Sequence, residues 1–246
     1  MFLGWLQLVL AIVFAGVLTG AVVAAIGSQR WLRHLQNVAP AARMTLIGAI
    51  LALPAASGLA ALALSFAPSV LDSLALVADH CGHHAGHAFH LCFVHGTPPE
   101  ASTALLVGGG LVAAWLLWQW AGELRNVTGT STWKERLETT STYDYDLGAW
   151  IIESERPLAV TVGLFRPQLF VSRSMPELLS EEQFDAVIAH EKAHARRRDS
   201  LVKFVLRSLS YGHFPVVREQ LLTALDTAFE QACDEAAADA VGDRLT

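Results

Sequence analysis

The chain has 246 residues, of which 53% are hydrophobic and 16% charged, and its formal net charge at pH 7 is -6. Soluble globular domains contain about 45–50% apolar residues, so this composition exceeds what an ordinary water-soluble domain requires. The modest negative charge argues against direct binding of nucleic acid, because proteins that bind nucleic acids neutralise phosphates with many basic side chains.

The apolar excess lies in the first half of the chain, in three long runs without a charged residue. They span residues 2–26, 44–71 and 103–121. Each is long enough, or nearly so, to cross a hydrocarbon layer of about 30 Å as a helix. The first run is too long for a cleaved signal peptide, and no basic residue precedes it. We therefore predict a transmembrane domain of three helices over residues 1–121.

The basic residues predict how these helices are oriented. Several arginines lie in the link 28–43 between the first two runs, and no Lys or Arg occurs in residues 44–124. Cytoplasmic loops carry the excess of Lys and Arg in membrane proteins. We therefore expect the N-terminus and the 72–102 loop outside the cell, and residues 122–246 in the cytoplasm.

Two glycines in the first run form a small-xxx-small motif, Gly16-xxx-Gly20. Small residues at this spacing let two membrane helices approach closely. Since such motifs are common in membrane helices, a homodimer built on this one is an open alternative.

The predicted external loop is rich in histidine and cysteine, the side chains that bind transition metals. It holds six of the ten histidines and two of the three cysteines of the chain. It either binds zinc, copper or nickel, with occupancy relayed through the spans, or carries a disulfide among solvated histidines. The candidate ligands are His80, Cys81, His83, His84, His87, His90, Cys92 and His95.

The second half is predicted to form a small α+β unit. It follows a polar connector, residues 121–145, in which at most one short helix is expected. Short runs typical of β-strands lie at 149–153, 159–162 and 169–172. Ser180-Glu-Glu-Gln183 matches a capping box, which predicts that a helix begins there. Further helices are expected over 201–211 and, after Pro215, over 216–240.

The helix after the capping box contains His190-Glu191-Lys-Ala-His194, an HExxH motif. Residues four apart lie on one face of a helix, so both imidazoles can bind one Zn²⁺. Glu191 lies beside them and could take a proton from the water that attacks a peptide bond. The alternative is a surface helix with two solvated histidines.

A zinc site of this type needs a third protein ligand, and Glu230 in the last predicted helix is the candidate. Asp234 lies one turn further and could accept a hydrogen bond from a ligating histidine. The alternative for these two residues is an acidic solvated face. Asp199 either anchors the HExxH helix or pairs with a nearby arginine. Cys233 is expected to be a buried packing residue.

Taken together, these motifs resemble the BlaR/MecR-type integral-membrane metallopeptidases of bacterial signalling. The resemblance covers roughly the last hundred residues, and the three spans match by topology only. HtpX-type membrane proteases look similar around the metal but differ in their Glu-containing signature and arrangement of spans. The matching segments are Thr161–Pro167, Ala186–His194, Arg197-Arg198-Asp199, Phe214-Pro215 and Glu230–Asp234.

The resemblance implies a zinc peptidase in the bacterial inner membrane whose site faces the cytoplasm. In the family, an external signal leads to proteolysis, and a transcriptional repressor is inactivated. No penicillin-binding sensor domain and no fourth span follow the peptidase unit in the 246 residues, so beta-lactam sensing is not expected. The missing span is explained either by a short member of the family or by a truncated chain. The expected partners are the lipid bilayer and a protein substrate, either a BlaI/MecI-type repressor or the chain itself.

These observations predict an α-helical membrane protein with three transmembrane helices and a C-terminal cytoplasmic α+β zincin-like (gluzincin) domain. The expected ligands are His190, His194 and Glu230, with Glu191 as the catalytic base. Strand 169–172 is the candidate edge that holds an extended substrate. Two alternatives remain: a housekeeping protease for misfolded membrane proteins, and a metal-binding receptor without proteolytic activity.

An oxyanion-stabilising group is also needed, and the candidates are Tyr211, His213 and Arg218. The basic run Arg196–Arg198 is expected to face lipid headgroups or a substrate.

Overall fold

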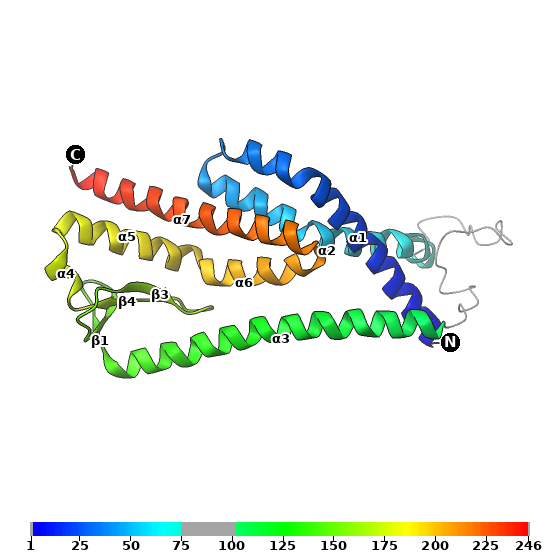
Figure 1. Cartoon of the computed structure of the whole chain (residues 1–246), viewed down its shortest axis with the longest axis horizontal. Coiled ribbons are helices and arrows are strands. Elements are labelled where there is room, and N and C mark those ends of the chain that lie inside the picture. Colours follow the sequence, from blue (N-terminus) through cyan, green and yellow to red (C-terminus); the bar gives the residue numbers. More distant parts are fainter. Residues whose placement is uncertain (1, 75–101, 246) are drawn as a thin grey trace. The chain divides into compact units, whose positions relative to one another are not determined.

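The computed structural model describes residues 2–74 and 102–245, which are mostly helical with one small mixed sheet (Figure 1). The predicted metal ligands of the 72–102 loop fall in residues 75–101, outside the described part of the chain. Contacts divide the chain into two compact units. The first holds Met1–Gln29, Ala49–Trp118 and Leu209–Arg218, and the second holds Arg30–Gly48, Gln119–Ser208 and Glu219–Thr246. The predicted division at residues 121 and 122 stays a prediction.

Three helices in the described residues are long and apolar enough to cross a membrane: α1 (Phe2–Leu35), α2 (Pro40–Ser73) and α3 (Thr103–Thr140). The prediction of only one short helix in the polar connector 121–145 was wrong, because α3 continues without a break to Thr140. The hydroxyl groups of this segment bond back to the preceding turn, as Thr130 does to the Asn126 carbonyl at 2.8 Å. These bonds satisfy the polar side chains within the helix itself.

Within the first unit, α1 and α2 pack through small residues. A Cβ atom on Gly16 would lie 2.6 Å from the Ser57 carbonyl oxygen, and one on Gly20 would lie 2.7 Å from Ser57 Oγ. A Cβ on Gly58 would lie 2.8 Å from Val17 Cγ2. The Gly16-xxx-Gly20 motif therefore brings two helices of one chain together, and a homodimer stays a prediction.

The second unit contains a four-stranded sheet in the order β1-β2-β4-β3. Its strands are β1 (Ser141–Asp144), β2 (Ala149–Ile152), β3 (Ala159–Val162) and β4 (Gln168–Ser172). β2 and β4 are parallel, and the other two pairings are antiparallel. The β3–β4 connection needs Gly163, which has a φ of 124° and whose Cβ would lie 2.5 Å from the Arg166 carbonyl oxygen.

The prediction that 169–172 is an edge strand was wrong. This segment is β4, which pairs with β2 on one side and with β3 on the other. Leu169, Phe170 and Val171 are all buried, and a strand with this much apolar surface is most stable at the centre of a sheet. The edges of the sheet are β1 and β3.

Four helices and one 3₁₀ turn follow the sheet. α4 covers Met175–Leu178 and α5 Glu181–Arg197, and α6 covers Asp199–Leu209. The turn η2 (Ser210–Gly212) leads to α7 (Pro215–Leu245). The predicted helices after the capping box, around 201–211 and after Pro215 are therefore confirmed, and α7 extends five residues beyond its expected end at 240.

The sheet and α5 share an apolar core in the second unit. Its buried members come from β2, β4, α4 and α5: Ala149, Leu169, Val171, Met175 and Ile188. Besides this packing, the Thr161 hydroxyl in β3 donates to the Glu191 carbonyl oxygen at 2.8 Å. The HExxH helix is thus held against the sheet by an apolar face and by a hydrogen bond from an edge strand.

Candidate metal centre

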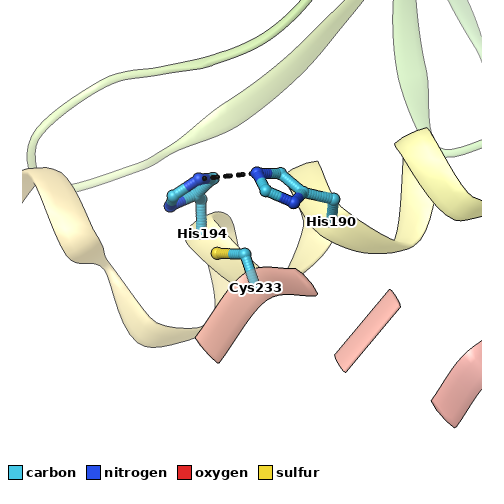
Figure 2. Close-up of side chains that lie close together, drawn as sticks. All are labelled: His190, His194 and Cys233. Atoms are coloured by element: carbon cyan, nitrogen blue, oxygen red, sulfur yellow. Dashed lines mark hydrogen bonds between the residues drawn. The ribbon is translucent and has the colours of Figure 1, made fainter. Parts of the chain in front are cut away.

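The HExxH helix begins where its sequence predicts. Ser180 Oγ accepts from the Gln183 backbone N–H, and the Gln183 side chain accepts from the Ser180 backbone N–H, which completes a capping box. From this start, His190 and His194 project from the same face of α5. Their Nε2 atoms lie 3.2 Å apart, and Figure 2 shows the two imidazoles facing each other.

Glu230 in α7 completes a triangle of donor atoms. Its Oε2 atom lies 3.5 Å from Nε2 of His190 and 3.5 Å from Nε2 of His194. Tetrahedral zinc with bonds of about 2.0–2.2 Å to nitrogen and oxygen places ligand atoms roughly 3.3–3.5 Å apart. The three donor atoms therefore fit one zinc ion. The Glu230 side chain is half-exposed, so solvent reaches this ligand.

Cys233 offers an alternative third ligand, because its sulfur and the two imidazoles lie within 4.8 Å of one another (Figure 2). The distances favour Glu230, because its Oε2 atom lies 3.5 Å from Nε2 of each histidine. The Cys233 sulfur is engaged elsewhere, since it accepts a hydrogen bond from Arg197 Nη2 at 2.7 Å. Burial raises the pKa of the Cys233 thiol to about 11. The predicted burial of Cys233 is confirmed, since its exposure is 0%.

Two carboxylates lie within hydrogen-bonding distance of the Nδ1 atoms of His190 and His194. Asp199 Oδ2 lies 2.7 Å from His194 Nδ1, and Asp234 Oδ1 lies 3.0 Å from His190 Nδ1. Metal-ligating histidines characteristically donate this second N–H to a carboxylate, which sets the ring orientation and leaves Nε2 for the metal. Both predicted supporting residues therefore lie against a predicted ligand.

The two groups of the His194–Asp199 pair shift each other's pKa. The hydrogen bond that His194 donates to the Asp199 carboxylate raises the pKa of His194 above its ordinary value. Burial acts to raise the pKa of Asp199, but hydrogen bonds from His194 and Arg197 outweigh it and lower that pKa. Asp199 is 3% exposed, so its hydrogen bond with His194 is shielded from solvent.

Arg197 belongs to the basic run that was expected to face lipid headgroups or a substrate, but its guanidinium binds Asp199 instead. One neighbour of the centre, Lys203, was not predicted as part of the site. Lys203 Nζ in α6 lies 3.6 Å from Glu230 Oε1 and 3.3 Å from Asp226 Oδ1. Its only sequence signal is its place on the polar side of an amphipathic helix, which does not identify a partner.

The predicted catalytic base and the three oxyanion candidates lie in different compact units. Glu191 is half-buried on the same turn of α5 as His190. The oxyanion candidates Tyr211, His213 and Arg218 belong to the first compact unit. There Arg218 donates to Ser210 Oγ at 2.8 Å and stacks on the Tyr211 ring. His213 Nε2 lies 3.2 Å from the Leu51 carbonyl oxygen. The oxyanion role stays a prediction.

Comparison with known families identifies the domain that carries this site. Residues 148–242 match the family described as Peptidase family M48, a family of zinc metallopeptidases. The match covers less than half of the chain, but it includes all residues of the donor triangle and the carboxylates beside it. No curated protein and no solved structure matches the chain. Residues 148–242 are thus similar to the M48 metallopeptidases, and the BlaR/MecR resemblance remains an interpretation of the motifs.

Proposed function

We propose that the protein is a membrane-anchored zinc metalloendopeptidase whose metal is held by His190, His194 and Glu230. The observation that carries this proposal is the triangle of donor atoms, with sides of 3.2, 3.5 and 3.5 Å. These distances match the separations expected around tetrahedral zinc. A gluzincin arrangement of two histidines and one glutamate leaves the fourth position for the reacting groups.

When bound, the zinc ion would supply Lewis-acid chemistry, polarising the scissile carbonyl and making water a better nucleophile. The Glu191 carboxylate would take the proton from the attacking water and deliver it to the leaving amine. Asp199 and Asp234 would keep the two imidazoles turned so that their Nε2 atoms converge. Lys203 would hold the second oxygen of Glu230 and so present the first oxygen to the centre.

The strand β3 is the corrected candidate for binding an extended substrate. It pairs with β4 on one side, and no strand within residues 2–74 and 102–245 pairs with its other side. Its Thr161 is bonded to the carbonyl of Glu191, next to His190. A peptide that adds to this free edge would gain main-chain hydrogen bonds and would run beside the metal ligands.

The membrane anchor and the signalling role extend this proposal. α1, α2 and α3 would span the bacterial inner membrane with the N-terminus outside and the peptidase domain in the cytoplasm, which the placement of arginines supports. The resemblance of Thr161–Pro167 and Glu230–Asp234 to BlaR/MecR-type proteins supports a substrate that is a BlaI/MecI-type repressor or the chain itself. Proteolysis would then transmit an external signal.

Zinc content of the detergent-purified full chain tests the metal site. We expect one zinc ion that is lost in the His190→Ala/His194→Ala and Glu230→Ala variants and that survives removal of the loop histidines. Glu191→Gln should keep its zinc and lose peptidase activity by a factor of about 10²–10⁴, as removal of a general base does. Zinc that persists without the three ligands, or that follows only the loop histidines, would refute the proposal.

A further inference from the structure

The guanidinium group of Arg197 connects the two parts of the chain that carry the proposed metal ligands. On one side, Nε lies 3.1 Å from Asp199 Oδ1 and Nη2 lies 2.9 Å from Asp199 Oδ2. On the other side, Nη2 donates to the Phe229 carbonyl oxygen at 3.4 Å and to Cys233 Sγ at 2.7 Å. One side chain therefore reaches both the α5–α6 junction and α7.

Local geometry explains how Arg197 and Asp199 come to face each other. Arg198 has left-handed backbone geometry, with a φ of 54°, and ends α5. The chain reverses at this residue, and Asp199 begins α6 close to the end of α5. Arg197 lies three residues after His194, hence on the same face of α5. The Asp199 carboxylate can therefore accept from the imidazole and from the guanidinium at the same time.

The contacts with α7 lie on either side of Glu230. Phe229 directly precedes this proposed ligand, and Cys233 follows it by three residues, on the adjacent turn. Cys233 is fully buried, and its thiol lies 3.9 Å from Asp199 Oδ2. The guanidinium thus holds the turn of α7 from which the Glu230 side chain projects.

We propose that Arg197 is a positioning residue of the metal centre, which sets the His194 imidazole through Asp199 and the Glu230 carboxylate through α7. This inference rests on the proposed zinc site. The planar guanidinium presents donors in a fixed fork that matches a carboxylate, and a lysine ammonium cannot reproduce that geometry. Loss of Arg197 would therefore misalign two of the three ligands without removing any of them.

The test compares zinc affinity of the full chain in detergent, measured by competition with a chromophoric chelator. The variants are Arg197→Gln, Arg197→Lys and, as a matched control, Arg196→Gln at the exposed neighbouring position. The visible absorption spectrum of the Co²⁺-loaded protein reports ligand geometry, and thermal unfolding of the metal-free protein reports folding. A residue that only supports the fold would change the unfolding temperature without changing the cobalt spectrum.

We expect Arg197→Gln to weaken zinc binding by about 10–100-fold, as changes in such supporting residues do, and to alter the cobalt spectrum. Arg197→Lys should restore part of the affinity, and Arg196→Gln should bind as the unchanged protein does. An Arg197→Gln protein with affinity within twofold and an unchanged spectrum overturns the inference. If that variant does not fold, Arg197→Lys decides: full affinity with the unchanged spectrum overturns the inference, and weaker binding with a changed spectrum supports it.

Failure of the proposed zinc site gives a different result from failure of the positioning role of Arg197. If the unchanged protein binds no zinc, or retains it after replacement of His190 and Glu230, the zinc site itself is refuted and the inference falls with it. If zinc depends on those ligands but not on Arg197, the proposed function stands and only the positioning role is rejected.

Discussion

His194 Nδ1 lies 2.7 Å from Asp199 Oδ2, although a helix end separates the two residues. The left-handed residue Arg198 makes this contact possible, because it turns the chain back on itself directly after α5. The sequence left two roles open for Asp199, an anchor of the HExxH helix and an ion pair with an arginine. The structure shows both contacts on one carboxylate, since Arg197 binds it as well.

Replacement of Asp199 should weaken the metal site more than replacement of Asp234. Asp199 is 4% exposed in its side chain, whereas Asp234 is 70% exposed, so water can take the place of Asp234 more easily. We expect Asp199→Asn to lower zinc affinity by about 10–100-fold, the usual effect of losing such a carboxylate. Asp234→Asn serves as the matched control with a smaller loss. Chelator competition at pH 7 measures both, and equal affinities for the two variants would contradict the burial argument.

The Cys233 thiol should be unreactive in the folded protein and dispensable for zinc. Its pKa of about 11 leaves little thiolate at neutral pH, and alkylation requires the thiolate. We expect slow labelling by iodoacetamide at pH 7, which accelerates with each increase of pH towards 11 and becomes fast in urea. Mass spectrometry of the Cys233 peptide measures this rate.

The companion variant Cys233→Ala distinguishes the two possible third ligands. It should retain one zinc ion, because Glu230 Oε2 is the donor that lies 3.5 Å from both imidazoles. Loss of zinc from Cys233→Ala, together with its retention in Glu230→Ala, would instead assign the metal to the sulfur.

Gly16→Ala should destabilise the first unit. The new Cβ would lie 2.6 Å from the Ser57 carbonyl oxygen, a backbone atom that cannot rotate away. Overpacking of this kind costs about 1–3 kcal/mol. Gly108→Ala is the matched control, because nothing lies within 4 Å of its Cβ position. Thermal unfolding in detergent should show a lower midpoint for Gly16→Ala only. A change in oligomeric state without a change in midpoint would instead favour the homodimer.

Thr161→Val should separate the role of β3 from metal binding. The change removes the hydroxyl that donates to the Glu191 carbonyl oxygen at 2.8 Å, and a hydrogen bond of this kind contributes about 1 kcal/mol to stability. We expect unchanged zinc content and a several-fold lower kcat/KM on a peptide substrate, because the edge strand is no longer tied to α5. Thr161→Ser keeps the hydroxyl and should retain activity. Equal kcat/KM values for both variants would remove β3 from the substrate site.

Local patterns in the sequence were enough to predict many elements of the fold. The three apolar runs became α1, α2 and α3, and the capping box at Ser180 begins α5 as expected. Helix periodicity also placed His190 and His194 on one face. These predictions succeeded because each depends on neighbours within one or two turns, or on the apolar length of a single helix.

Other features depend on contacts between distant segments, which only the tertiary structure decided. The parallel pairing of β2 with β4 placed the 169–172 strand in the centre of the sheet and left β3 at its edge. The packing of α7 on α5 decided which Glu230 oxygen faces the imidazoles and brought the Arg197 guanidinium to Cys233. Helix spacing orders side chains along one element, whereas the meeting of two elements is settled by burial of their apolar faces over the whole unit.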